Sequence, residues 1–220
     1  VEMMRKIGAR VEYTEKEGFP PVLIEGRIIR GGKVRMQNIH SSQFVSAMIL
    51  NSIVWEKGLE LSFPDAPPSK AYILMTLKLM KKLGLNVSLS SNMLGTEKSE
   101  IVNMEFENEA DWSSAAYFYE IVSLMPGSEL FFTDLSYDSI QGDQRLADIY
   151  YSLGVATSQA PNGLLIKNLK KRTASPFNID LTDTPDLVPS LCASLAALGI
   201  ESTLSGVRHL KYKESDRLKV

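Results

Sequence analysis

Hydrophobic and polar residues follow two different patterns along this chain. Short runs that alternate or are bounded by glycine and proline, such as residues 22–24, are typical of β-strands. Longer runs, such as residues 44–55, have apolar side chains on every side of a helix, with only a few small polar interruptions. A helix that is apolar all round is ordinarily covered on every side. The pattern therefore predicts helices packed inside and strands lying outside them.

The order of these elements repeats. Apolar helices are predicted at residues 44–55, 112–124 and 187–198, and each is followed by a glycine, a strand and the start of a second helix. Two series of polar residues mark the helix starts at a constant spacing of 72 positions (114−42 and 186−114; 141−69 and 213−141). These residues are Ser42, Ser114 and Asp186 in one series, and Ser69, Gln141 and Lys213 in the other. Two series in step indicate an internal structural repeat.

The repeat predicts an α/β or α+β fold, in two lobes built from repeated β-α units. Further strands are expected at residues 9–14, 33–37, 59–63, 86–90, 101–106, 129–133 and 201–204. We place the boundary at the acidic link near Glu107, giving a first lobe of residues 1–108 and a second of 109–220. Gly8 precedes Gly84 by 76 positions (84−8), so the chain begins near the end of a unit. We expect a fragment with two artificial ends.

Composition excludes several classes of partner. The 220 residues include 24 Lys and Arg against 26 Asp and Glu, so no basic excess indicates nucleic acid, and any anion site must be local. The longest apolar run is too short to cross a bilayer. Two histidines and one cysteine cannot form an ordinary zinc cluster, and no metal is expected. Cys192 lies in an apolar run and is predicted to be a core residue in a reducing compartment, so we expect a cytoplasmic protein.

Candidate chemistry lies at the starts of the predicted helices. Ser, Thr and Asp there commonly cap free backbone donors, and this is our interpretation of Ser113, Ser114 and Asp143. Ser41-Ser42-Gln43 offers two hydroxyls and an amide, which suit an oxyanion or phosphate.

Charged groups gather at two other predicted helix starts. A helix expected to begin at Glu214 would bring Lys213 and Arg217 to one face. Asp186 and Glu214 together are the paired carboxylates that proton transfer in two directions requires.

These motifs, in this order, resemble those of the EPSP synthase family, 3-phosphoshikimate 1-carboxyvinyltransferase, over nearly the whole chain. The matching segments are Ser41-Ser42-Gln43, Ser69-Lys70-Ala71-Tyr72, Glu109-Ala110-Asp111-Trp112-Ser113-Ser114-Ala115, Gln141-Gly142-Asp143, Pro185-Asp186 and Lys213-Glu214-Ser215-Asp216-Arg217-Leu218. The resemblance implies two lobes of repeated β-α units. It also implies transfer of an enolpyruvyl group from phosphoenolpyruvate to the 5-hydroxyl of shikimate 3-phosphate, with release of phosphate, on the route to aromatic amino acids.

The resemblance also assigns roles to individual residues. Those implied to hold shikimate 3-phosphate are Ser41, Ser42, Gln43, Ser69, Tyr72, Asp186 and Lys213. Arg217, with Gln43, is implied to hold phosphoenolpyruvate. We assign Asp186 as proton acceptor and Glu214 as proton donor, with an exchange of these roles left open. No metal or organic cofactor is required, and we expect the full-length protein to be a monomer.

Two departures from the family pattern affect this interpretation. His209 stands where members often carry asparagine four residues before the Lys-Glu pair, so that contact is not carried over. The family's early Lys-Ser and Arg, a further Arg, and the late Arg and Lys that bind phosphoenolpyruvate have no counterpart in these 220 residues. We therefore predict that this chain alone turns over very slowly or not at all.

Two alternatives stay open. The related enolpyruvyl transferase that acts on UDP-N-acetylglucosamine is expected to use a cysteine in a mobile loop, whereas Cys192 lies in a predicted core helix. A non-catalytic repeat scaffold would have no need of both Asp186 and Glu214.

Overall fold

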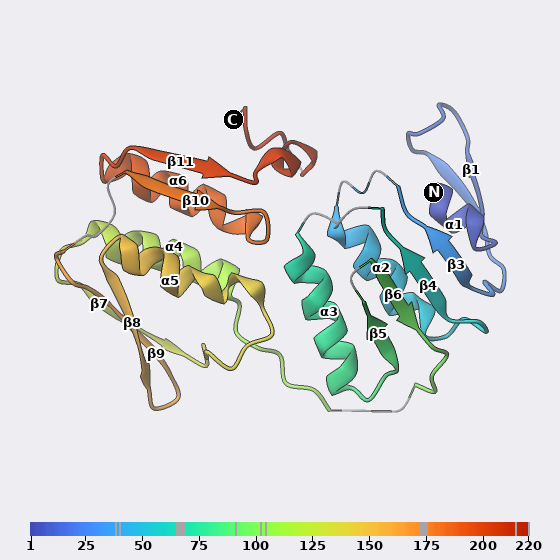
Figure 1. Cartoon of the computed structure of the whole chain (residues 1–220), viewed down its shortest axis with the longest axis horizontal. Helices are drawn as coiled ribbons and strands as arrows, with labels where there is room; N and C mark the ends of the chain where they lie inside the picture. The colour runs from blue at the N-terminus through green and yellow to red at the C-terminus, as the bar shows by residue number, and fades with distance from the viewer. Residues whose placement is uncertain are drawn as a thin grey trace. The chain divides into compact units, whose positions relative to one another are not determined.

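The computed structural model describes the whole chain except residues 38, 40, 65–68, 91, 102, 104, 172–175, 214 and 220. It contains two compact units, Val1–Met104 and Glu105–Val220 (Figure 1). The division lies a few residues before the boundary expected from sequence. The roles predicted for the two lobes stay predictions.

Unit 1 is a sheet packed against helices. After α1 (Glu2–Lys6), an antiparallel hairpin is formed by β1 (Arg10–Tyr13) and β2 (Val22–Glu25). A four-stranded sheet of order β3-β4-β6-β5 follows, made of β3 (Gly32–Arg35), β4 (Leu59–Ser62), β6 (Met93–Thr96) and β5 (Val87–Leu89). The helices α2 (Ser42–Ser52) and α3 (Lys70–Lys82) contact one another and share their core with the sheet (Figure 1).

Alternation along β4 explains why the sheet and the helices share this core. Leu59 and Leu61 are buried, while Glu60 between them and Ser62 after them point to the other face. Val45 and Ile49 of α2 are buried one helical turn apart, as expected for a face that packs on a sheet.

Unit 2 is built in layers of strands and helices. Its elements are α4 (Trp112–Leu124), β7 (Glu129–Thr133), η1 (Gly142–Arg145), α5 (Leu146–Ser152), β8 (Val155–Ala160), β9 (Gly163–Asn168), β10 (Phe177–Asp180), η2 (Pro185–Leu187), α6 (Val188–Ala197), β11 (Ser202–Ser205) and η3 (Arg208–Tyr212). Strands β7, β9 and β8 form an antiparallel sheet, and β10 pairs in parallel with β11. Figure 1 shows α4 and α5 between this sheet and the β10–β11 pair.

The predicted fold class, α/β with repeated β-α units, is confirmed. The order of helix, strand and second helix recurs in α2-β4-α3 and in α4-β7-η1-α5. In the last copy, α6 and β11 are followed only by the short η3. The predicted helix starting at Glu214 is wrong for the described part of its range, because residues 215–219 form a bend and a turn. The backbone N of Arg217 donates to the carbonyl of Leu210, seven residues back, a bond that a regular α-helix does not make.

Three other predictions differ from the structure. The strand expected at residues 101–106 is not present among the described residues of that range, which are exposed and have no neighbouring strand to complete a ladder. Helix α2 is not covered on every side, because Phe44 and Leu50 are exposed while its other face packs on the sheet and α3. Cys192 is exposed on α6 and is not a core residue, because one step along the helix turns its side chain by about 100° from the buried Leu191.

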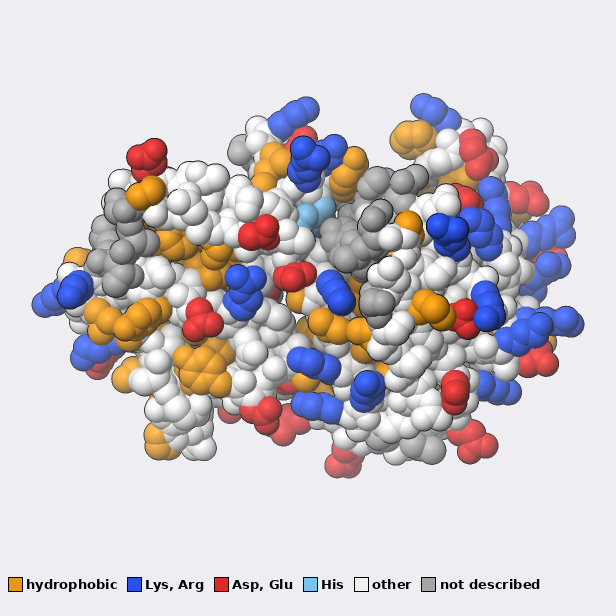
Figure 2. All heavy atoms as spheres, in the orientation of Figure 1, with side chains coloured by type: hydrophobic (Ala, Val, Ile, Leu, Met, Phe, Trp, Pro, Cys, Tyr) orange, Lys and Arg blue, Asp and Glu red, His pale blue; other side chains and the backbone are white. Residues whose placement is uncertain are grey.

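Figure 2 shows the charges on one face of the molecule. On the face shown in Figure 2, acidic and basic side chains are interspersed, in keeping with a formal net charge of −2. Within the part of the chain that the structure describes, none of the helices is both long and apolar enough to span a membrane.

Candidate functional site

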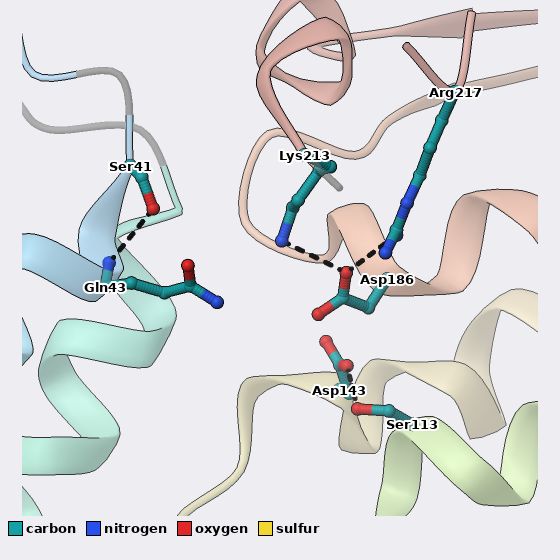
Figure 3. A network of polar contacts seen from close by, with 7 residues as sticks. All are labelled: Ser41, Gln43, Ser113, Asp143, Asp186, Lys213 and Arg217. Carbon is teal, nitrogen blue, oxygen red and sulfur yellow. Dashed lines mark hydrogen bonds and ion pairs between the residues drawn. The ribbon is translucent and has the colours of Figure 1, made fainter. Parts of the chain in front are cut away.

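Ser41, Ser42 and Gln43 lie at the N-terminal end of α2. Ser41 is the N-cap residue in an extended conformation, and its Oγ accepts a hydrogen bond from the Gln43 backbone N at 3.2 Å (Figure 3). Ser42 is buried in the first turn, whereas the Gln43 side chain is exposed. The cap orients the end of the helix, whose free N–H groups and positive dipole favour an anion.

Ser69 and Tyr72 lie at the N-terminal end of α3. Ser69 is buried and has φ 55° and ψ 44°, a left-handed conformation that non-glycine residues rarely adopt. Its carbonyl accepts a hydrogen bond from Tyr72 N at 3.1 Å, which begins the first turn. Strained backbone of this kind concentrates at functional positions.

A hydroxyl pair holds these two helix starts together. Thr76 Oγ1, in the second turn of α3, donates to Ser46 Oγ of α2 at 3.0 Å and lies 3.0 Å from the carbonyl of Tyr72. Thr76 is buried and Ser46 is half-buried, so the bond is partly shielded from water. The predicted residues of unit 1 therefore belong to two neighbouring helix ends, and all of them offer neutral hydroxyl or amide groups.

Asp186 is the centre of a charged cluster in unit 2. It lies in η2, which begins at Pro185 and leads directly into α6. Its Oδ1 is 3.2 Å from Lys213 Nζ and 3.1 Å from Arg217 Nη1 (Figure 3). All three side chains are at most one-third exposed, so these ion pairs are only partly screened by solvent.

The two cations lie in the loop after η3, not in an α-helix, and Leu210 of η3 anchors that loop. The carbonyl of Leu210 accepts hydrogen bonds from Lys213 N and Arg217 N, both at 3.4 Å. The Leu210 side chain is fully buried in the core of unit 2. The core thus anchors the backbone that carries Lys213 and Arg217, although the helix predicted to align them is not formed.

His209 of η3 borders the same cluster. Burial, and next the positive charge of Lys213, lower the pKa of His209 below its ordinary value, while Asp186 opposes this effect. The neutral imidazole is therefore favoured beside Lys213. Glu214, the predicted proton donor, lies outside the described residues.

The sequence interpretation missed a pair of side chains near Asp186. Ser113, Ser114 and Asp143 were expected to cap helix starts, and this is wrong: the N-cap residues are Asp111 for α4 and Gln141 for η1. Asp111 accepts from Ser113 N at 3.0 Å and from Ser114 Oγ. Ser113 Oγ instead donates to Asp143 Oδ2 at 2.6 Å.

Polar side chains also fasten the start of α4 to the loop before η1. Glu109 accepts hydrogen bonds from Ser139 Oγ at 2.7 Å and from Ile140 N, and Gln141 Nε2 donates to the carbonyl of Ala110 at 2.8 Å. Gln141 Oε1 accepts from Trp112 N at 2.9 Å. These contacts position η1, and with it Asp143. In the sequence, Gln141 is marked by its place in the 72-residue repeat, where it corresponds to Ser69 and Lys213.

The described residues contain no group of three or more His, Cys, Asp and Glu side chains placed to hold a metal ion. The cluster of Asp186, Lys213 and Arg217 itself offers charge compensation by its two cations and proton exchange at its carboxylate.

Comparison with known proteins identifies the family. The sequence model of EPSP synthase (3-phosphoshikimate 1-carboxyvinyltransferase) matches residues 1–220, the whole chain. The chain belongs to the EPSP synthase family. Among curated EPSP synthase relatives, the 3-phosphoshikimate 1-carboxyvinyltransferase of Bacteroides fragilis is 35% identical over 219 residues, covering 99% of this chain and 53% of that protein. The protein of the same name from Methanoculleus marisnigri is 30% identical, covering 99% and 51%.

A solved structure of EPSP synthase from Acinetobacter baumannii has the same fold. It matches 99% of this chain and 50% of its own length, with a TM-score of 0.67 and 20% sequence identity. The chain thus spans about half the length of the EPSP synthase relatives that it matches.

Proposed function

We propose that this chain is the acceptor-binding and proton-transferring part of an enzyme that moves an enolpyruvyl group from phosphoenolpyruvate to the 5-hydroxyl of shikimate 3-phosphate, releasing phosphate. The observation that carries the proposal is the contact of Asp186 with both Lys213 and Arg217 in a chain of the EPSP synthase family. A carboxylate beside two cations can serve a reaction in which a hydroxyl loses a proton near anionic groups.

Each predicted residue has a role in this proposal. Ser41, Ser42, Gln43, Ser69 and Tyr72 bind shikimate 3-phosphate through hydroxyl and amide groups at two helix starts. Their neutral donors, together with the helix dipoles, suit a phosphate or polyol. No cofactor is required for this binding.

The charged residues carry the chemistry. Asp186 accepts the proton of the attacking hydroxyl, and Lys213 offsets the charge of shikimate 3-phosphate. Arg217 offsets the charge of phosphoenolpyruvate, and Glu214 donates a proton to its methylene carbon. Elimination of phosphate then returns that proton. One carboxylate must therefore accept a proton while the other donates one.

The test is a calorimetric titration of the chain with shikimate 3-phosphate. We expect saturable binding that Lys213→Met weakens by about tenfold or more, as expected for loss of a hydrogen bond to a charged group. Lys219→Met is the matched control, because it removes the same charge from a strongly exposed side chain of the same segment. Equal weakening by both variants would show that net charge alone attracts the ligand.

A second set of titrations separates the alternatives. Binding of a UDP-N-acetylated amino sugar in place of shikimate 3-phosphate would favour the related transferase. A protein extended to the length of its relatives should turn over both substrates, and Glu214→Gln should abolish that turnover. Absence of binding by the extended protein would overturn the proposal.

We propose further that the small-molecule substrates are the main partners, and that the extended protein is cytoplasmic and monomeric. The near balance of charge supports small-molecule partners over nucleic acid, and the single cysteine supports a reducing compartment. Sedimentation of the extended protein tests the monomer, because a concentration-dependent dimer would contradict it.

A further inference from the structure

Asp143 is a buried carboxylate to which the proposed reaction gives no role. It lies in η1 with 1% of its surface exposed, and its Oδ2 accepts a hydrogen bond from Ser113 Oγ at 2.6 Å. Removing a carboxylate from water is unfavourable, so a buried carboxylate requires polar or charged neighbours. Buried ionisable groups near a cluster of charges are candidates for function.

The placement of Asp143 relates it to Asp186. The elements that carry them, η1 and η2, both contact α4. Figure 3 shows the carboxylate of Asp143 pointing toward that of Asp186, from the side opposite Lys213 and Arg217. The two cations converge on Asp186 Oδ1.

Polar groups beside these two carboxylates are also unusual. Gln144 Oε1 in η1 and Thr184 Oγ1 before η2 are buried and have no hydrogen-bond partner among the described residues. Buried polar atoms in folded proteins are ordinarily paired. These two atoms lie in the segments that carry Asp143 and Asp186.

We propose that Asp143 is a positioning residue that acts through Asp186: its negative charge raises the proton affinity of Asp186 and counterbalances Lys213 and Arg217. The inference rests on the proposed function of Asp186 as proton acceptor. Two neighbouring cations alone would make Asp186 a weak base, because they stabilise its ionised form. A second carboxylate on the opposite side restores a proton affinity suited to accepting a proton in turnover.

Other groups also act on Asp186 and must be held constant. Lys213 and Arg217 come from the loop after η3, and His209 comes from η3 itself. His209 is favoured in its neutral form, whereas Lys213 and Arg217 are cations that form ion pairs with Asp186. Ser113 from α4 holds Asp143 in place.

The test follows the side-chain carboxyl carbon of Asp186 by carbon-13 NMR as a function of pH, assigned with Asp186→Asn. In Asp143→Asn we expect the Asp186 titration midpoint to fall by about one pH unit or more, the size expected when a facing like charge is removed. Asp138→Asn, which removes the same charge from an exposed residue of unit 2, should leave the midpoint in place. Ser113→Ala, which loosens Asp143, should give a smaller fall.

A purely structural role for Asp143 predicts a different result. Asp143→Asn would then lower the stability of unit 2 without moving the Asp186 midpoint, and this outcome would overturn the inference. If the variant does not fold, the unmodified chain supplies the test, because two facing carboxylates titrate as a coupled pair in two steps. A single, simple Asp186 titration in the unmodified chain would equally overturn it.

This experiment is independent of substrate binding. A coupled titration without binding of shikimate 3-phosphate would retain the carboxylate pair and reject the proposed function. Binding without coupling would retain the proposed function and reject the role of Asp143.

Discussion

The predicted binding residues of unit 1 and those of unit 2 are held by different kinds of backbone. Ser41 and Ser69 are N-cap residues of the regular helices α2 and α3, and the helices are joined by the bond from Thr76 to Ser46. Lys213 and Arg217, in contrast, come from an irregular loop, held by the carbonyl of Leu210 and by ion pairs to Asp186.

The difference shows how neutral and charged groups are positioned. A hydroxyl at a helix start is oriented by the backbone beside it, so local sequence suffices to place it. A long cationic side chain loses much more rotamer freedom when it is held in one geometry. In unit 2, the buried Leu210 must hold the loop that follows η3, and the Asp186 carboxylate must hold the side chains of Lys213 and Arg217.

The largest expected effect comes from truncating Leu210, which anchors the loop that carries Lys213 and Arg217. Leu210→Ala removes a fully buried side chain from the core of unit 2 and should lower its free energy of unfolding by about 2–5 kcal/mol. It should also release the backbone that carries Lys213 and Arg217. Hydrogen exchange of the α6 amides measures the loss in unit 2 alone, and the amides of α2 in unit 1 should keep their protection.

A control in the same segment sharpens this result. Leu218→Ala removes the same atoms from a half-exposed side chain and should change stability by no more than about 0.5 kcal/mol. Equal losses for Leu210→Ala and Leu218→Ala would show that the loop is not anchored by the core.

The strained start of α3 gives an intermediate effect in unit 1. Ser69→Gly and Ser69→Ala both remove the hydroxyl, but only alanine retains a Cβ at φ 55°. The glycine variant should be more stable than the alanine variant by about 1–2 kcal/mol, the usual cost of a left-handed conformation. Urea denaturation of the two variants measures the difference.

The same pair of variants separates strain from binding. If the hydroxyl of Ser69 binds shikimate 3-phosphate, both variants should weaken that binding in calorimetric titrations, although their stabilities differ. Equal stabilities would show that the backbone relaxes when the hydroxyl is removed, and that no strain is held at this position.

Much of the fold could be predicted because the repeat is local information. Apolar runs and glycine stops are visible in single segments, so α2, α3, α4 and α6 were expected close to their observed positions. The strand expected at residues 101–106 shows the limit of such patterns. Its residues alternate between apolar and polar, but alternation cannot tell whether a neighbouring strand completes the ladder.

Some residues of the candidate site could likewise be placed from local sequence, and others could not. Ser41 was expected at a helix start and is the N-cap residue of α2, because capping depends on adjacent residues. The contact from Ser113 to Asp143 joins residues 30 positions apart in sequence, and helix-start rules gave both of them the wrong role. The ion pairs of Asp186 depend on where the loop after η3 lies in three dimensions, which no local pattern specifies.

The smallest expected effect is a change in the titration of His209, which tests whether the charges of unit 2 act on one another. Burial is the largest cause of the lowered pKa of His209, and Lys213 is the next. Lys213→Met should therefore raise the pKa of His209, and Asp186→Asn should lower it further. Proton NMR of the imidazole Cε1–H measures both changes, and Lys219→Met serves as the control for charge.

The sign of the accompanying stability change follows from the lowered pKa. The unfolded chain binds a proton at His209 near its ordinary pKa of about 6.5, and the folded chain does so only at lower pH. In that interval the unfolded state holds more protons, so unit 2 should lose stability as pH falls below about 6.5. His209→Gln should remove this dependence. If Lys213→Met leaves the pKa of His209 unchanged, Lys213 does not contribute to lowering it. Lys213 would then act on Asp186 through its ion pair and not on His209.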